Sequence, residues 1–178
     1  MRVIAGALKG RRLEAPDWSG LRPTSDRLRE TLFNVLAPHI GGARFLDAFA
    51  GTGAVGIEAL SRGAAHVTFV EQDRRAHRLI ERNLEHCGVK DRYAIIRAGF
   101  AGAARQIGAQ FDLLFLDPPY GAAQLVGALE AAAALVAPEA LLVIEHARRD
   151  EAPEQIAGLT RTRQLLSGDS ALAFYRAQ

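Results

Sequence analysis

The sequence contains a single cysteine and no long apolar run, and both facts rule out whole classes of protein. With Cys87 alone, the chain can form neither an internal disulfide nor a zinc site built from several cysteines. The longest apolar run, 131–137, is far short of the roughly 18 to 20 residues that cross a bilayer. Residues 1–9 have too short an apolar core for a secretory signal, so we expect a cytoplasmic protein with no membrane partner.

The histidines are too scattered to indicate a metal centre. They have no closely spaced histidine or carboxylate partners of the kind that bind zinc, and they stand at His39, His66, His77, His86 and His146. We therefore predict no metal, and we interpret Cys87 as a small buried hydrophobic residue.

Apolar residues are abundant, and charged residues are present in ordinary number. Apolar residues make up 49% of the sequence and charged residues 24%, which is typical of a packed globular domain and too hydrophobic for a disordered chain. A chain of 178 residues fits one domain with one sizeable core. We predict a single domain over 1–178, in which residues 1–42 form an appendage to a core over 43–178.

The charge is unevenly distributed along the chain. The formal net charge is only +2, but residues 1–29 contain seven basic and three acidic side chains, which gives this segment +4 and the remainder −2. Phosphate contacts dominate nucleic-acid affinity, and a basic segment of this kind is their usual source. A solvated basic surface would produce the same pattern, so charge alone leaves both interpretations open.

From residue 44 onward, short apolar runs alternate with longer amphipathic stretches. This alternation is typical of βαβ units around a largely parallel sheet, and thus of the α/β class. One helix is predicted between Asp73, its N-cap, and Gly88. Another is predicted over 122–137, ended by Pro138. The predicted strands are 44–48, 66–71, 94–98, 112–117 and 141–145.

The pattern changes after the fifth predicted strand. Residues 161–166 and 172–176 fit two strands joined by a turn, which predicts a closing hairpin that adds a reversed strand. A mainly parallel sheet of seven strands with an antiparallel C-terminal hairpin strand is the layout of Rossmann-like class I methyltransferases. Before the core, strand-like runs around Gly10 and apolar residues at helical spacing over 28–36 predict a small N-terminal β-hairpin and a helix.

A glycine-rich turn follows the first predicted strand and leads into a helix. Gly51 and Gly53 have no Cβ, so the backbone can turn tightly and approach a ligand, and Gly56 would let the helix pack near the sheet. The same three glycines match the dinucleotide fingerprint G-x-G-x-x-G. The turn therefore predicts a nucleotide-like ligand and leaves a nicotinamide or flavin enzyme open.

Asp47 discriminates between these cofactors. Its carboxylate, four residues before Gly51, faces the place where a dinucleotide would put its pyrophosphate, and like charges repel there. S-adenosylmethionine has no phosphate and carries an ammonium group that a carboxylate can hold. Asp47 therefore favours S-adenosylmethionine, and its alternative role is that of a helix cap.

The carboxyl ends of the next two strands supply the nucleoside contacts. Glu71 is placed to accept hydrogen bonds from both ribose hydroxyls, with a plain surface acid as the alternative. The third strand ends without an acid, so the adenine would rely on backbone groups near Ala98 and Gly99. The predicted cofactor site consists of Asp47, Ala48, Phe49, Gly51, Thr52, Gly53, Glu71, Gln72, Ala98 and Gly99.

The motif Asp117-Pro118-Pro119-Tyr120 ends the fourth strand, beside the switch point where open α/β sheets bind ligands. The exocyclic amine of a base is a poor nucleophile because its lone pair is delocalised into the ring. Asp117 and the Pro118 carbonyl can each accept a hydrogen bond from one of the two amino hydrogens, which favours a tetrahedral nitrogen. The two prolines fix φ and present no competing N–H. Tyr120 can stack on the base, a contact worth roughly 1 to 3 kcal/mol.

These residues predict direct in-line methyl transfer without a covalent intermediate, accelerated by positioning and electrostatic preorganisation. Asp117 would steer the amine and then accept its proton. Cysteine attack on a ring carbon has no nucleophile, because Cys87 lies in a predicted helix far from the motif. Taken alone, the motif also fits an ordinary Asp-Pro turn after a strand.

Several blocks of sequence, spread along the whole chain, resemble those of a known family. They are residues 2–6, 9–11, 21–34 and 47–53, together with the Asp-Pro-Pro motif. In these blocks the sequence resembles the RsmD-like family, methyltransferases that modify N2 of a guanine in 16S ribosomal RNA. The block from Arg22 to Asn34 is the most specific, because many amino methyltransferases share the other motifs.

The resemblance implies a substrate that composition does not reveal. We expect N2-methylation of a specific guanine in 16S ribosomal RNA, within an assembled or assembling small subunit and with no obligate protein partner. It places Arg22 to Arg29 over the cofactor and target base, and Arg11 and Arg12 on the RNA backbone. The RNA-binding residues that it implies are Arg11, Arg12, Arg22, Thr24, Arg27 and Arg29.

Three other functions remain open at this point. The Asp-Pro-Pro-Tyr motif also serves DNA adenine-N6 methylation, although the forty or so residues before the core leave little room for a domain that reads DNA sequence. A nicotinamide-dependent oxidoreductase would share the glycine turn. A non-catalytic RNA-binding module could retain the cofactor pocket without the chemistry.

Overall fold

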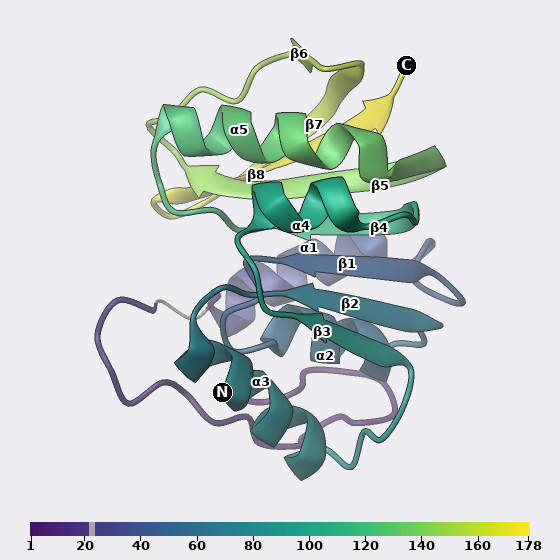
Figure 1. The fold of residues 1–178 in the computed structure, drawn as a ribbon, viewed down its shortest axis with the longest axis vertical. Helices are drawn as coiled ribbons and strands as arrows, with labels where there is room; N and C mark the ends of the chain where they lie inside the picture. Colours follow the sequence, from purple (N-terminus) through teal and green to yellow (C-terminus); the bar gives the residue numbers. More distant parts are fainter. Residues whose placement is uncertain (22–23) are drawn as a thin grey trace.

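A sheet of eight strands runs through the computed structural model, which describes residues 1–21 and 24–178 (Figure 1). The predicted RNA contact Arg22 lies outside the described residues. The helices are α1 (Asp26–Leu36), α2 (Ala54–Ser61), α3 (Arg74–His86), α4 (Phe100–Gln106), α5 (Ala122–Ala132) and the 3₁₀ helix η1 (Ala133–Leu135). The strands are β1 (Arg44–Ala48), β2 (His66–Val70), β3 (Tyr93–Ile96), β4 (Phe111–Leu116), β5 (Val136–Ala147), β6 (Gln155–Ile156), β7 (Leu159–Ser167) and β8 (Ser170–Ala177).

The strand order is β3-β2-β1-β4-β5-β8-β7-β6. Strands β1 to β5 are parallel, and β8, β7 and β6 continue the sheet in antiparallel pairs. This arrangement confirms the predicted α/β class, the Rossmann-like parallel core and the antiparallel C-terminal hairpin. The order reverses between β1 and β4, so the switch point lies where the glycine turn and the Asp-Pro-Pro motif leave the sheet.

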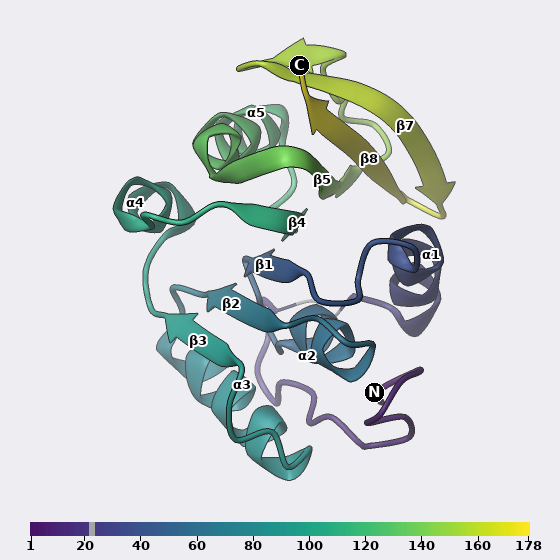
Figure 2. The same cartoon turned by 90° about the vertical axis from the view of Figure 1, so that its right-hand side faces the viewer.

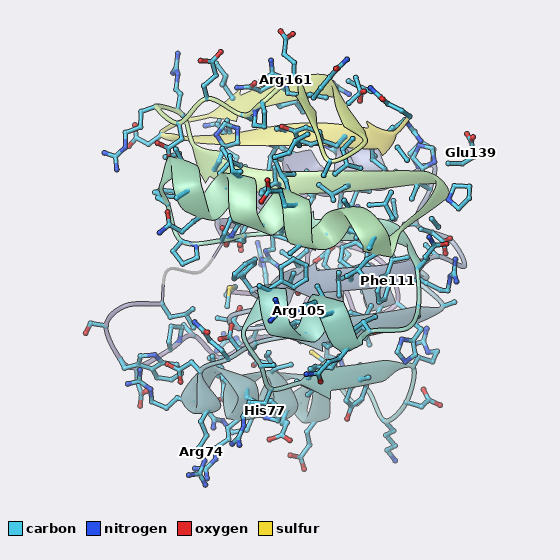
Figure 3. All side chains as sticks on the ribbon, turned by 45° about the horizontal axis from the view of Figure 1, so that its top comes forward. Arg74, His77, Arg105, Phe111, Glu139 and Arg161 are labelled. Carbon is cyan, nitrogen blue, oxygen red and sulfur yellow. The ribbon has the colours of Figure 1, made fainter. Side chains whose placement is uncertain are left out.

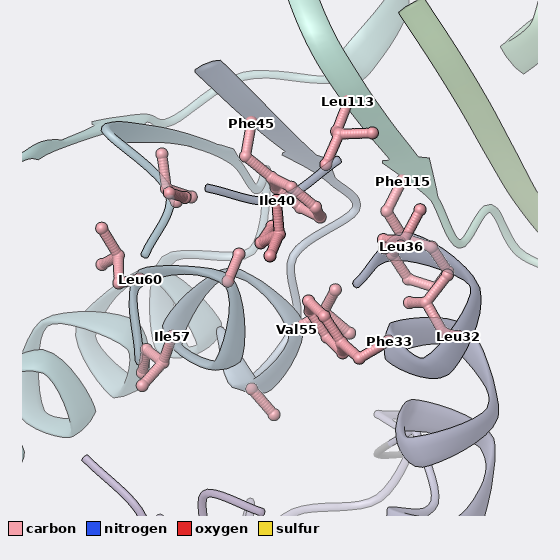
Figure 4. Packing of buried hydrophobic residues seen from close by; sticks show 14 of the residues in the cluster. Leu32, Phe33, Leu36, Ile40, Phe45, Val55, Ile57, Leu60, Leu113 and Phe115 are labelled. Carbon is pink, nitrogen blue, oxygen red and sulfur yellow. The ribbon is translucent and has the colours of Figure 1, made fainter. Parts of the chain in front are cut away.

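Helices cover both faces of the sheet, with α1 and α2 on one side and α4 and α5 on the other (Figure 2). The central strands are apolar on both faces for this reason. On the α1 side, Phe33 stacks on Phe45 with ring centroids 6.3 Å apart, and Leu36 packs in the same cluster as Phe115 (Figure 4). This packing holds the second half of α1 against the sheet.

Local signals in the sequence account for the two amphipathic helices. Ser25 caps α1, because its hydroxyl accepts a hydrogen bond from the backbone N–H of Leu28. Asp73 caps α3 in the same way, as predicted, and Gly88 follows its end with a positive φ of 73°. Arg74, at the start of α3, is exposed on its outer side (Figure 3), whereas the polar side chain of Asn83 is buried.

The parallel register aligns the residues that follow the strands. Ala48 pairs with Val70 on one side and Leu116 on the other, and Leu116 pairs with Ile144. The next residue along each strand is therefore at the same level of the sheet. That row consists of Glu71, Phe49, Asp117 and Glu145.

The structure corrects the predicted helix end at 137, the predicted start of the fifth strand at 141 and the predicted number of strands. The helix predicted over 122–137 ends at Ala132, because Val136 already pairs with Phe111 in the sheet. Pro138 lies within β5, where the register between β4 and β5 shifts and a ladder hydrogen bond is dispensable. The short strand β6 makes eight strands instead of seven.

The predicted N-terminal β-hairpin is present but short: an antiparallel bridge joins Arg2 and Arg12, and the backbone of Val3 exchanges hydrogen bonds with Gly10 and Arg11. Two buried carboxylate oxygens explain why the segment leaves strand geometry: Glu58 of α2 accepts hydrogen bonds from the backbone N–H groups of Ile4 and Ala5. Val3 and Leu13 are buried in the same cluster as α1 and α2. In the part of the chain that the structure describes, no helix has the length and apolar character needed to cross a membrane.

Candidate active site

A cavity of about 780 Å³ opens at the carboxyl ends of the parallel strands. Its walls are the glycine turn, the ends of β2, β4 and β5, the loop 18–21, the start of α1 and the turn between β7 and β8. This volume is in the range of sites that hold a nucleoside cofactor. The cavity brings together seven of the ten predicted cofactor residues and all four residues of the catalytic motif. They are Asp47, Phe49, Gly51, Thr52, Glu71, Gln72 and Ala98, with Asp117, Pro118, Pro119 and Tyr120.

The glycine turn needs its glycines for two different reasons. Gly51 and Gly53 have φ values of 59° and 78°, in the left-handed region that favours glycine. Gly56 has no such φ, but a Cβ there would lie 2.2 Å from the ring of Phe69 on β2. Gly56 therefore lets α2 pack directly on the sheet, which was the role predicted for it.

Asp47 lies beneath the turn and is 1% exposed. Its Oδ2 accepts a hydrogen bond of 2.8 Å from the backbone N–H of Gly56, so Asp47 does cap the first turn of α2. Burial raises its pKa to about 8; the Gly56 hydrogen bond opposes this, and the charge of Glu71 adds to it. A cation bound beside Asp47 would favour the ionised carboxylate and lower this pKa, so the site is suited to a cationic ligand that takes the place of the proton.

The carboxylate of Glu71 binds the backbone of the two loops that follow β1 and β2. Its Oε2 accepts a hydrogen bond from the N–H of Gly51, and its Oε1 accepts one from the N–H of Asp73, both at 2.8 Å. Each carboxylate oxygen has two lone pairs, so both can still accept a hydrogen bond from a hydroxyl group. The arrangement fixes Glu71 beside the glycine turn, where a ribose would lie.

Three predicted cofactor residues are not among those that line the cavity. Ala48 is fully buried, and its carbonyl accepts a hydrogen bond of 3.3 Å from the N–H of Asp117. Gly53 is the N-cap of α2 and Gly99 the N-cap of α4. These residues position the cavity wall and do not form its surface.

The catalytic motif forms the opposite wall. The hydrogen bond from Asp117 to Ala48 ties the motif to β1 and hence to the glycine turn. Pro118 is buried, whereas Pro119 and Tyr120 are exposed. The Tyr120 hydroxyl and the Ser170 Oγ lie 2.7 Å apart, which holds the aromatic ring at the mouth of the cavity against the turn between β7 and β8.

The predicted RNA contacts divide into three groups. Thr24 and Arg27 line the mouth of the cavity. Arg11 and Arg12 are exposed on the N-terminal segment. Arg29, in contrast, is fully buried, so its prediction as an RNA contact is wrong.

Arg29 is buried because it shares a helical face with Phe33 and Leu36, four and seven residues further along α1. Its Nη2 donates to the carbonyl of Arg2 at 2.8 Å, and its Nη1 lies 3.6 Å from a carboxylate oxygen of Glu58. The side chain therefore joins α1 to α2 and to the N-terminal segment. The helical spacing in the sequence was the signal that would have revealed this.

The predicted site missed several residues that line the cavity, Glu145 and Trp18 among them. Glu145, at the carboxyl end of β5, is 6% exposed and lines the cavity. Trp18 lies across the cavity mouth, with the guanidinium of Arg75 5.0 Å from the centroid of its indole. The rule that ligands bind at the carboxyl ends of strands would have found Glu145, since the strand 141–145 was predicted.

The charges around the cavity are mostly negative. Among the described residues, six carboxylates and two arginines line it. Those residues contain no group of three or more histidine, cysteine or acidic side chains that could hold a metal ion. The cavity thus disfavours a pyrophosphate and favours a cation.

Comparison with known proteins gives the chain its family. The family described as "Conserved hypothetical protein 95" matches residues 1–176. This chain belongs to that family. It is 38% identical to the ribosomal RNA small subunit methyltransferase D of Escherichia coli (strain K12), over 100% of this chain and 90% of the relative.

Two further relatives agree over the full length. YlbH of Bacillus subtilis (strain 168) is 38% identical, over 99% of this chain and 98% of that protein. The solved structure of yhhF from Escherichia coli is 34% identical and superposes with a TM-score of 0.89, covering 100% of this chain and 98% of that one. The predicted membership of the RsmD-like family is confirmed.

Proposed function

We propose that this protein is an S-adenosylmethionine-dependent methyltransferase that methylates the N2 amino group of a guanine in 16S ribosomal RNA. The observation that carries the proposal is that the Asp117 motif and the glycine turn face one cavity and are joined by the hydrogen bond from Asp117 to Ala48. Membership of the family, and the name of the Escherichia coli relative, support ribosomal RNA as the substrate.

The residues of the cavity fit this cofactor. Asp47 offers a buried carboxylate to an ammonium group, and Glu71 offers two oxygens to a ribose. The negative lining would repel the pyrophosphate of a nicotinamide cofactor, which argues against the oxidoreductase. When bound, S-adenosylmethionine supplies an electrophilic methyl group on a sulfonium.

The catalytic motif acts on the amine. Asp117 and the carbonyl of Pro118 accept the two amino hydrogens and direct the nitrogen lone pair toward the donor. Tyr120, held by Ser170, stacks on the base and keeps it at the cavity mouth. The proton released from the amine passes to Asp117. Cys87 has no part in this chemistry, since it is buried at the end of α3 and burial raises the pKa of its thiol.

The finer form of the proposal concerns the target and its setting. We assign the guanine-966 type of site, presented by an assembled or assembling small subunit. Arg27 and Thr24 at the cavity mouth would contact the target nucleotide, and the exposed Arg11 and Arg12 the RNA backbone further away.

The test is a survey of substrates with a labelled methyl donor. The protein is incubated with unmodified small ribosomal subunits, with the free RNA and with duplex DNA, and the methylated nucleoside is identified. N2-methylguanosine from the subunit or its RNA is the expected product. N6-methyladenosine, or labelling of DNA alone, would replace the proposed substrate with the adenine-N6 alternative. Absence of any transfer, with RNA still bound, would favour the binding module.

A further inference from the structure

Glu145 occupies a place in the cavity that the proposed chemistry does not yet use. It is the residue that follows Ile144 in β5, and it is almost completely buried. Its side chain nevertheless lines the cavity, at the side that also holds the catalytic motif. Its position in the cavity wall puts this carboxylate where a ligand in the cavity can contact it.

The sheet register places Glu145 beside Asp117. Leu116 and Ile144 are paired in the parallel ladder, so the residues that follow them, Asp117 and Glu145, are neighbours on adjacent strands. Adjacent parallel strands lie about 4.8 Å apart, and side-chain direction alternates along each strand. Phe115 and Val143, two residues earlier, both belong to the core on the α1 side, so Asp117 and Glu145 are both directed to that side.

Two carboxylates side by side match one particular base edge. The Watson–Crick edge of guanine presents two adjacent donors, the N1–H and the N2 amino group. In the proposed function, Asp117 and the carbonyl of Pro118 accept hydrogen bonds from the amino group, which leaves the neighbouring N1–H in need of an acceptor of its own. Adenine presents a bare N1 acceptor at the corresponding place, and a carboxylate there would repel it.

We propose that Glu145 is a specificity-determining residue that accepts a hydrogen bond from N1–H of the target guanine, while Asp117 and Pro118 hold its N2 amino group. The inference rests on the proposed function and names the group that selects guanine over other amino-bearing bases. No proton is transferred to Glu145. Sites built around such a hydrogen bond discriminate strongly, because a base without the donor leaves the buried acceptor unsatisfied.

The test pairs a change in the protein with a change in the base. Small subunits are reconstituted with either guanine or 2-aminopurine at the nucleotide found methylated in the substrate survey. 2-Aminopurine keeps the amino group and has no N1–H. We expect the wild-type protein to prefer guanine in kcat/KM by at least about 100-fold, the effect of losing a hydrogen bond to a buried charge.

The Glu145→Gln variant should reduce this preference to within about tenfold, because the glutamine amide can accept from N1–H or donate to a bare N1. Glu139→Gln is the matched control, since it removes an exposed carboxylate from the same strand at the end away from the cavity (Figure 3). Affinity for the methyl donor, measured by calorimetry, should be the same in both variants and the wild type.

The outcomes separate this inference from the proposed function. A wild-type protein that methylates guanine and 2-aminopurine equally well would overturn the role of Glu145, even if the Glu145→Gln variant does not fold. A preference that Glu145→Gln leaves unchanged would overturn it too. If the wild-type protein methylates no guanine at all, the proposed function itself fails, and the role of Glu145 fails with it.

Discussion

Replacing Asp47 with asparagine should stabilise the protein and abolish its affinity for the methyl donor. The carboxylate is buried with a pKa of about 8, so the fold keeps a proton that the unfolded chain releases above pH ~4. The free energy of unfolding is therefore highest below that pH, falls as the pH rises toward 8 and levels off above it. The side-chain oxygen of an asparagine can still accept the hydrogen bond from the N–H of Gly56. Because asparagine does not ionise, the variant should not lose stability as the pH rises from 4 to 8.

The raised pKa sets the size of the effect. An elevation from 3.8 to about 8, at 1.36 kcal/mol per unit, gives an upper bound of roughly 5 to 6 kcal/mol. One third of that bound, about 2 kcal/mol, would raise the unfolding midpoint by roughly 4 to 8 °C in a chain of this size. The gain should be present at pH 8 and nearly absent at pH 4.

Thermal unfolding of both proteins between pH 4 and pH 9, with donor affinity by calorimetry, measures the two effects. Asp112→Asn is a control of opposite sign, because its partner Arg44 lowers the pKa of Asp112 and the site is largely exposed. A variant of Asp47 that is no more stable than the wild type at pH 8, or that binds the donor equally well, would refute the reasoning.

Two other substitutions test the packing. Gly56→Ala should lower the free energy of unfolding by roughly 1 to 3 kcal/mol in denaturant, because its Cβ would lie 2.2 Å from Phe69. Gly127→Ala in α5 is the control: its Cβ meets no atom within 4 Å, so it should be neutral or stabilising. Equal effects of the two substitutions would contradict the close approach of α2 to the sheet. Arg29→Ala should cost roughly 3 kcal/mol, since it strips a buried partner from Glu58. Arg27→Ala should leave the free energy of unfolding unchanged and lower the salt dependence of RNA binding by about one charge. If Arg29→Ala instead weakens RNA binding without a loss of stability, Arg29 is an RNA contact after all.

The parts of the fold with strong local signals were predictable from the sequence. The bounds of β1 were correct to the residue, because a buried apolar run is followed at once by the glycine turn. The caps of α3 were also correct. At the site, the sequence singled out the glycine turn and the Asp-Pro-Pro motif because each follows a strand end and has residues of unusual conformation or charge, and both line one cavity.

The remaining errors come from tertiary contacts that leave little trace in the sequence. Pro138 suggested the end of a helix, but pairing of Val136 with Phe111 had already started a strand. The N-terminal hairpin is short because the N–H groups of Ile4 and Ala5 donate to the carboxylate of Glu58, more than fifty residues away. Arg29 is the exception: the family resemblance placed it among the RNA contacts, although its helical spacing puts it on the apolar face of α1.

The account depends on Asp117 acting on the amine, and single-turnover methyl transfer by Asp117→Ala is its most direct test. With the wild-type protein and unmodified small subunits as reference, we predict a fall in the rate of transfer of at least about 100-fold, the usual size of a lost transition-state contact. Affinity for the subunit and for the methyl donor should stay within a few-fold of the wild type. Transfer at an undiminished rate would contradict the mechanism.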